Sequence, residues 1–146
     1  MSSETTIKGL LDTHKLRKTI IRTEILGIFM KYDFALSVSD LVDKLDIKND
    51  RVTVYRALAT FEECGILHKA SEGKHGVKYA LCRHSLTGGN PTPQHAHFVC
   101  KECNQTFCLE NVLVPKVEVS DDFLVDRIDY TLSGVCNKCK NTSQKS

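Results

Sequence analysis

The chain has 146 residues, enough for one domain or for two small ones. Its apolar content of 41% and charged content of 26% are ordinary for a soluble globular protein, and no stretch approaches the ~20 apolar residues that span a bilayer. The net charge of +2 does not by itself indicate a nucleic-acid partner, and the lack of an apolar leader predicts a cytoplasmic chain without a membrane partner.

The first part of the chain carries helical patterns. Ile7, Leu10 and Leu11 predict a short amphipathic helix, and apolar residues at helical spacing predict a second helix over Thr19–Lys31. A basic segment, residues 14–22, leads into the start of the second helix; it contains no acid and includes Lys15, Arg17, Lys18 and Arg22. Such a segment is often only a solvated face, but its place just before a helix also suits a phosphate or minor-groove contact.

Two further helices have recognisable starts. Ser37 and Asp40 resemble a capping box that opens a short third helix. Asp50 can cap a fourth helix running to Cys64, which Gly65 would end. The inward stripe of that helix is predicted to be Val54, Ala57, Leu58 and Phe61.

Two short strand-like runs follow the fourth helix. Residues 66–70 and 77–81 flank a polar, glycine-containing stretch and predict a hairpin. Helices followed by a hairpin are the order of a winged helix, in which the last helix before the hairpin enters the major groove of DNA. Residues predicted away from the inward stripe, at the start of that helix where base edges are reached, are Arg51, Thr53, Tyr55 and Arg56.

The rest of the chain lacks helical patterns and instead carries loop and strand patterns. Residues 83–94 contain glycines and prolines and predict a hinge or loop between residues 1–82, a winged-helix DNA-binding domain, and residues 95–146, a second domain. Within that second domain, residues 97–109 predict strands, residues 123–136 a hairpin, and residues 141–146 a disordered tail. The expected class is therefore α+β.

Two cysteine pairs are the strongest chemical signal: Cys100-x2-Cys103 and Cys136-x2-Cys139. The 32 residues between them are enough for a small sheet that brings the pairs together. Four thiolates give tetrahedral zinc a closed shell, which is typical of a structural site. The alternatives are two disulfides, which an odd total of seven cysteines and a reducing compartment disfavour, or a redox Cys-x-x-Cys.

Taken together, these motifs resemble the ferric uptake regulator family over nearly the whole chain. The matching segments, in family order, are Thr53-Val-Tyr-Arg-x-Leu58, Phe61-Glu-x-x-Gly65-Ile, Tyr79-Ala-Leu, His95-x-His97-Phe-Val-Cys100-x-x-Cys103 and Cys136-x-x-Cys139. The resemblance implies a homodimeric, metal-dependent repressor that binds a pseudo-palindromic double-stranded DNA operator through its winged helix, with a small α/β dimerisation domain stapled by zinc.

The resemblance also implies roles for single residues. Tyr55 and Arg56 match the family's DNA-reading pair, Arg17 its basic minor-groove residue, and Arg22 a contact to the DNA backbone. A second, regulatory metal is expected to join the two domains. Its candidate ligands are Cys82 at the hinge, His95 and His97 two positions apart on a strand, Cys108 where many relatives carry a glutamate, and His68 on the first wing strand, with Glu72 as a competitor.

Departures from the family pattern bear on which metal is sensed. Ala96 and Ala80 stand where relatives carry an acidic residue, and Ala35 and Ile128 stand near usual histidine positions. The remaining sulfur and imidazole donors suit Zn²⁺ better than Fe²⁺, which normally has more oxygen ligands. Pro115 also interrupts a segment that is usually a long helix, so that helix is expected to be short or missing.

The sequence therefore predicts a zinc-sensing regulator of metal uptake genes that is not an enzyme. An iron- or peroxide-responsive regulator of the same fold, with Fe²⁺ at the regulatory site, is the nearest alternative. A thiol oxidoreductase is disfavoured because neither cysteine pair is expected at a strand-to-helix turn that would lower a thiol pKa. A zinc ribbon that binds only protein would leave Tyr55 and Arg56 unexplained.

Overall fold

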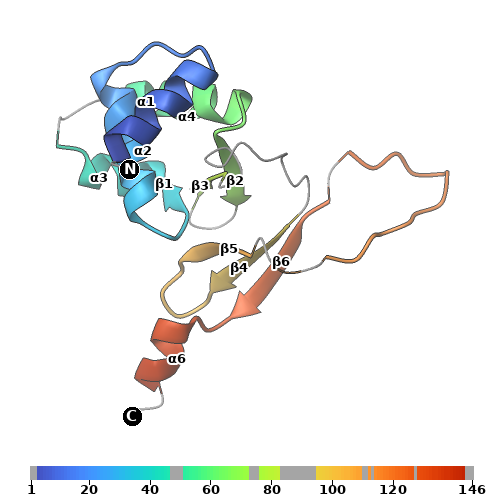
Figure 1. The fold of residues 1–146 in the computed structure, drawn as a ribbon. Coiled ribbons are helices and arrows are strands. Elements are labelled where there is room, and N and C mark those ends of the chain that lie inside the picture. Colours follow the sequence, from blue (N-terminus) through green and yellow to red (C-terminus); the bar gives the residue numbers. More distant parts are fainter. Residues whose placement is uncertain are drawn as a thin grey trace. The chain divides into compact units, whose positions relative to one another are not determined.

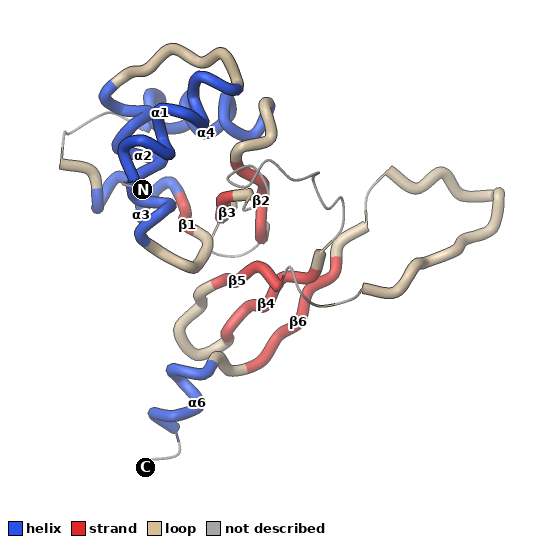
Figure 2. Tube along the Cα trace, viewed as in Figure 1, coloured by secondary structure: helices blue, strands red, loops and turns tan. Residues whose placement is uncertain are grey.

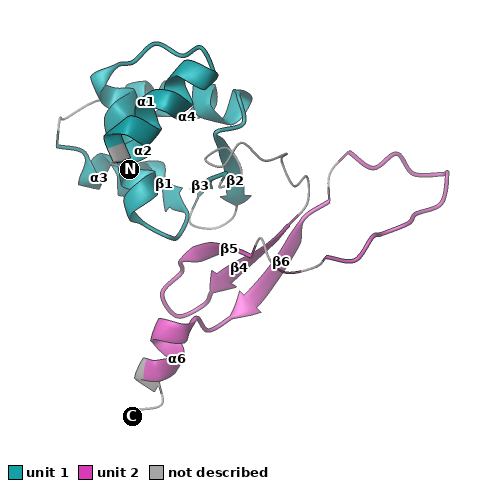
Figure 3. Cartoon of the chain, in the orientation of Figure 1, with its two compact units in different colours: residues 1–91 teal, residues 92–146 magenta. Residues whose placement is uncertain are grey.

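Residues 3–46, 51–72, 76–82, 95–109, 112, 114–126 and 128–143 are described by the computed structural model. They belong to two compact units, residues 1–91 and residues 92–146 (Figure 3). Asp50 and the whole predicted hinge, residues 83–94, lie outside the described residues. No helix in the described ranges is long and apolar enough to cross a membrane.

Unit 1 contains four helices and a small sheet within its described residues (Figure 1). The helices are α1 (Ser3–Thr13), α2 (Ile20–Lys31), α3 (Val38–Lys44) and α4 (Arg51–Glu63). The strands are β1 (Leu36–Ser37), β2 (Leu67–Ser71) and β3 (Lys78–Leu81). Strand β3 lies between the other two and pairs with both in antiparallel fashion.

The ends of these helices follow from local chemistry. The Thr19 hydroxyl accepts a hydrogen bond from the backbone N–H of Arg22 and so caps α2. Ser37 and Asp40 form the predicted capping box at the start of α3, where each side chain bonds the other's backbone N–H. Gly65 adopts a φ of +85°, a left-handed conformation that ends the turn after α4 and that glycine tolerates.

The core of unit 1 is formed by apolar side chains from all four helices and the sheet. The four residues predicted to face inward from α4 are buried there, so the predicted inward stripe is confirmed. The largest fully buried side chains of this core are Phe29, Phe61, Leu11, Ile25, Leu26, Leu36, Leu41, Leu58, Ile66, Leu67 and Val54. Helices packed on an antiparallel wing confirm the winged-helix prediction.

Unit 2 is built on a three-stranded sheet of order β5-β4-β6. Its elements are β4 (Ala96–Cys100), β5 (Thr106–Leu109), β6 (Tyr130–Gly134) and α6 (Asn137–Ser143). Strands β4 and β5 pair antiparallel, whereas β4 and β6 pair parallel, with Cys100 opposite Gly134. A sheet followed by a helix confirms the predicted α/β character of this part and the α+β class of the chain.

Two predictions for unit 2 are wrong. The stretch 123–136 is not a hairpin, because its strand β6 pairs with β4 in parallel and the described residues 123–126 form no strand. The tail is not disordered from residue 141, because α6 continues to Ser143. The expected loss of the helix around Pro115 agrees with the structure, in which the described residues 114–126 form no helix or strand (Figure 2).

Candidate metal centres and nucleic-acid interface

The four knuckle cysteines converge at one end of the sheet in unit 2. Because β4 and β6 run parallel and in register, Cys100 at the end of β4 lies beside the end of β6, and Cys136 follows two residues later. The turn after Cys100 brings Cys103 back, and α6 carries Cys139. All four Sγ atoms lie within 4.8 Å of one another.

The spacing of the four thiols fits a zinc ion. Zn–S bonds of about 2.3 Å in a tetrahedron place sulfur atoms roughly 3.8 Å apart. The Sγ atoms of Cys103 and Cys136 are 3.8 Å apart. No disulfide joins any of the seven cysteines, all of which lie within the described residues, so the disulfide alternative is wrong.

Backbone geometry supports the same arrangement. Asn104 has a φ of 62°, which closes the first knuckle so that its N–H donates to the Cys100 carbonyl at 2.8 Å. In the second knuckle, the N–H of Lys140 donates to the Cys136 carbonyl at 2.8 Å. The N–H of Cys136 donates to the Cys100 sulfur at 3.4 Å, which links the two knuckles directly.

The thiols of this cluster differ in acidity. Hydrogen bonds from the backbone N–H groups of Cys103 and Cys136 lower the pKa of Cys100 to about 6. Burial, together with the neighbouring thiols, raises the pKa of Cys139 to about 12. Four close thiolates repel one another, so full ionisation needs a cation among them, and zinc would supply that charge.

One argument against thiol catalysis needs correction. The second pair does lie at a strand-to-helix turn, because Cys136 follows β6 and Cys139 lies in α6. A helix N-terminus normally lowers a thiol pKa. Here burial and the neighbouring thiols raise the pKa of Cys139 instead.

A second group of donors lies on and beside strands β4 and β5 of unit 2. His97 on β4 is opposite Cys108 on β5, and His95 precedes β4. Their ligand atoms lie within 4.8 Å of one another, and the rings of His95 and His97 are 4.5 Å apart. Burial, with a smaller contribution from His95, lowers the pKa of His97 to about 4. His97 is therefore neutral near pH 7, the form that binds a metal.

Unit 1 holds a separate pair of donors. His68 on β2 places its Nδ1 atom 3.1 Å from the Sγ atom of Cys82, which directly follows β3. The backbone of Cys82 is fixed by a 2.9 Å hydrogen bond from its N–H to the Ile66 carbonyl, and its side chain is buried. Glu72, the competing ligand, forms an ion pair with Lys69 at 3.5 Å.

Four of the residues predicted to contact DNA come together in unit 1. Arg56 and Thr53 of α4, together with Arg17 and Arg22, line a cavity of about 360 Å³. The Arg22 guanidinium donates to the Arg17 carbonyl at 2.8 Å, which holds the basic loop against the start of α2. Tyr55 is 52% exposed on the same helix. Three arginines in one cavity make a site that attracts phosphate.

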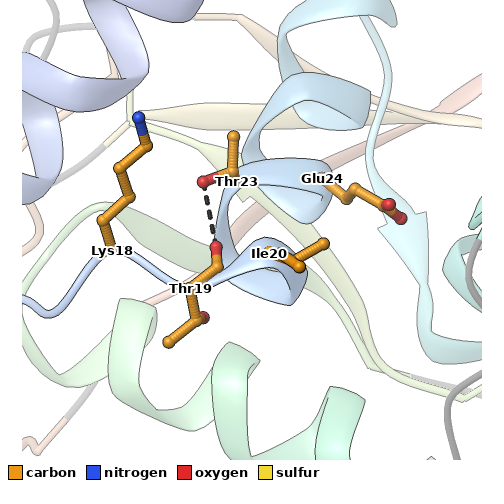
Figure 4. Close-up of a pocket in the computed structure, with 5 residues that line it drawn as sticks. All are labelled: Lys18, Thr19, Ile20, Thr23 and Glu24. Atoms are coloured by element: carbon orange, nitrogen blue, oxygen red, sulfur yellow. Dashed lines mark hydrogen bonds between the residues drawn. The ribbon is translucent and has the colours of Figure 1, made fainter.

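Thr19 fixes the position of this basic loop. Its carbonyl accepts a 2.9 Å hydrogen bond from the Thr23 hydroxyl, in addition to the cap that its own side chain provides (Figure 4). A neighbouring cavity of about 320 Å³ is lined by Lys18, Thr19, Ile20, Thr23 and Glu24. A buried carboxylate oxygen of Glu24 has no hydrogen-bond partner within the described residues.

One exposed residue of α4 was not predicted. Val52 is 54% exposed, although valine normally favours the interior. Its position, two residues before the buried Val54, is a helical signal that could have shown it to face outward.

The profile of the Ferric uptake regulator family matches residues 13–121. The chain belongs to this family. A ferric uptake regulation protein of Bordetella parapertussis is 28% identical over 148 residues, which cover 96% of this chain and 98% of that protein. A ferric uptake regulation protein of Neisseria gonorrhoeae is also 28% identical, with 86% and 87% covered.

Solved structures agree on the fold. A zinc uptake regulator complexed with zinc and DNA superposes with a TM-score of 0.69 at 23% identity, covering 99% of each chain. The Helicobacter pylori ferric uptake regulator superposes with a TM-score of 0.59 at 14% identity, covering 96% of this chain and 95% of that one. Family membership makes the chain a metal-responsive transcriptional regulator rather than an enzyme.

Proposed function

We propose that this chain is a zinc-sensing repressor that controls metal uptake genes as a homodimer on a pseudo-palindromic operator. In this proposal residues 1–82 bind DNA, residues 83–94 form the hinge, and residues 95–146 form the dimer. The observation that carries it is the composition of the donor set. His95, His97 and Cys108 offer two imidazoles and one thiol, without a carboxylate among them.

The donor set favours zinc on chemical grounds. Thiolate and imidazole ligands in a tetrahedron suit Zn²⁺, whereas Fe²⁺ sites usually contain more oxygen. The His68–Cys82 pair of unit 1 would supply the remaining ligands, so that zinc holds the DNA-binding domain in its operator-binding arrangement. Metal and DNA would then bind with a mutual coupling of ~1–3 kcal/mol.

A metal titration of operator binding tests the identity of the metal. Fluorescence anisotropy under anaerobic conditions should show activation at Zn²⁺ concentrations where Fe²⁺ activates poorly. Cys82→Ser should lose the exchangeable zinc, keep the structural zinc and no longer respond to metal. Cys64→Ser is the matched control, because its thiol donates to the Phe61 carbonyl at the end of α4, within unit 1.

The iron-sensing alternative has its own support, since the relatives above are named ferric uptake regulation proteins. Equal activation by micromolar Fe²⁺, together with a normal response of Cys82→Ser, would favour that alternative and reject zinc sensing.

The DNA-binding assignment is tested separately. Arg56→Ala should remove a base contact worth ~1–3 kcal/mol per half-site while zinc content stays unchanged. Arg17→Ala should weaken binding to all sequences and reduce the salt slope by about 1 for each phosphate that the variant no longer neutralises. Lys116→Ala removes a positive charge from the exposed loop of unit 2 and serves as the control. Wild-type operator binding by Arg56→Ala would reject the recognition-helix assignment.

A further inference from the structure

Val52 occupies the centre of the exposed face of α4. An α-helix turns roughly 100° per residue, so Val52 points about 200° away from Val54, on the side opposite the core. Its side chain is 54% exposed, whereas Val54 and Leu58 are fully buried. An exposed β-branched residue at the second position of the helix contributes nothing to the core of unit 1.

The neighbours of Val52 define what it can meet. Tyr55 and Arg56 lie one turn further along the helix, at spacings of three and four residues, and flank Val52 on either side. The Arg51 guanidinium is held by a 3.1 Å hydrogen bond to the Ser39 hydroxyl of α3, away from this face. The first exposed turn of α4 therefore presents an apolar side chain between a phenol and a guanidinium.

The charge around this face favours a polyanion over an apolar protein surface. Arg17, Arg22 and Arg56 line the adjoining cavity together with Thr53. A partner protein with an apolar surface would have to bury these guanidinium groups, at a large desolvation cost. Double-stranded DNA instead places phosphates against the arginines and base edges against the centre of the helix face.

Valine can recognise only one feature of the major groove. It has no hydrogen-bonding group, and the single apolar group that bases display there is the C5 methyl of thymine. Its branched side chain also holds one preferred rotamer in a helix, so little conformational freedom is lost on contact. We infer that Val52 is a specificity-determining residue that contacts a thymine methyl in each operator half-site. This inference rests on the proposed function.

The test removes the methyl group and the side chain in turn. An operator is first selected from a random duplex library by the zinc-loaded protein, and each thymidine of a half-site is then replaced singly by deoxyuridine. One replacement should weaken the wild-type protein about 4-fold, and the symmetric pair about 15-fold, because a buried methyl group is worth about as much as one buried CH₂. The Val52→Ala protein should bind the thymidine operator and its deoxyuridine-substituted form with equal affinity.

Val119→Ala is the matched control, because Val119 is a similarly exposed valine (51%) in unit 2. It should keep the full sensitivity to deoxyuridine. If the Val52→Ala protein still binds the operator and is weakened by deoxyuridine at the same positions and to the same extent as the wild type, this inference alone is overturned. Failure of the zinc-loaded wild type to select any DNA sequence would overturn it together with the proposed function.

Discussion

The two units of this chain are stabilised in different ways. Unit 1 buries a continuous apolar cluster, in which Phe29, Phe61 and Leu26 are almost fully inaccessible. The described part of unit 2 buries mainly small side chains, namely Ala96, Cys100, Thr106 and Cys136. Phe123 and Leu124 of unit 2 are 69% and 93% exposed. Burial of apolar area therefore stabilises unit 1, whereas we propose that unit 2 depends on metal.

Removal of the structural zinc should give the largest difference in stability between the two units. Cys103→Ser should lose one zinc equivalent and unfold unit 2, because structural zinc contributes ~10–16 kcal/mol of apparent binding free energy. Unit 1 should stay folded. Hydrogen exchange with mass spectrometry would show reduced protection on β4, β5 and β6 only. Retention of zinc and of full protection would show that unit 2 does not need the metal.

Truncation of a core side chain should destabilise unit 1 and leave the zinc site of unit 2 unaffected. Phe61→Ala should lower the free energy of unfolding of unit 1 by ~3–5 kcal/mol, since its ring is fully buried. Zinc content should not change. Urea unfolding monitored by helical circular dichroism measures the effect, and Phe123→Ala, at an exposed phenylalanine of unit 2, is the matched control. Equal effects of both substitutions would contradict a core confined to unit 1.

A smaller effect is expected where the sheet meets the zinc site. A Cβ atom added at Gly134 would lie 3.2 Å from the Phe98 ring, closer than ordinary contact. Gly134→Ala should push β6 away from β4 and cost ~1–3 kcal/mol, so zinc should transfer faster to a chromophoric chelator. Phe98→Leu in the same protein should restore slow transfer. If Gly134→Ala alone releases zinc at the wild-type rate, β4 and β6 can accommodate the added methyl group without separating.

The smallest expected effect concerns a helix start in unit 1. Ser37→Ala removes one half of the capping box and should destabilise the unit by ~1 kcal/mol. Thermal unfolding measures it, with Ser120→Ala in the exposed loop of unit 2 as the control. An unchanged melting temperature would mean that the Asp40 side chain alone is enough to hold the start of α3.

The helical half was predictable because its signals are local. Periodic apolar residues, the Ser37–Asp40 box and Gly65 each specify structure within a few residues. The parallel pairing of β4 with β6 was not predictable in this way, because the partners lie more than thirty residues apart and no local pattern records which strands meet. The alternating residues around Phe123 therefore resembled a hairpin strand that the structure does not contain.

The candidate sites also divide into features with a local sequence signal and features that depend on long-range contacts. The spacing of each cysteine pair specified the four-thiol cluster, and the family motifs specified the residues of α4. The outward position of Val52 could have been read from the helix period, whereas the hydrogen bond that draws Arg51 to Ser39 is a tertiary contact without a sequence signal. The 3.1 Å approach of His68 to Cys82 likewise depends on how two wing strands pair.

The parallel pairing of β4 with β6 has a consequence for chain entropy. Parallel strands need a long connection, and the described residues 114–126 of that connection form no helix that could hold the strands together. Zinc held by Cys100 and Cys136, 36 positions apart, would close this loop as unit 2 folds, and closing it costs about 4 kcal/mol of chain entropy, which the binding free energy of zinc offsets. That cost changes by only about 0.6 kcal/mol when the loop doubles in length. The connection can therefore change in length and carry Pro115 without loosening the knuckles.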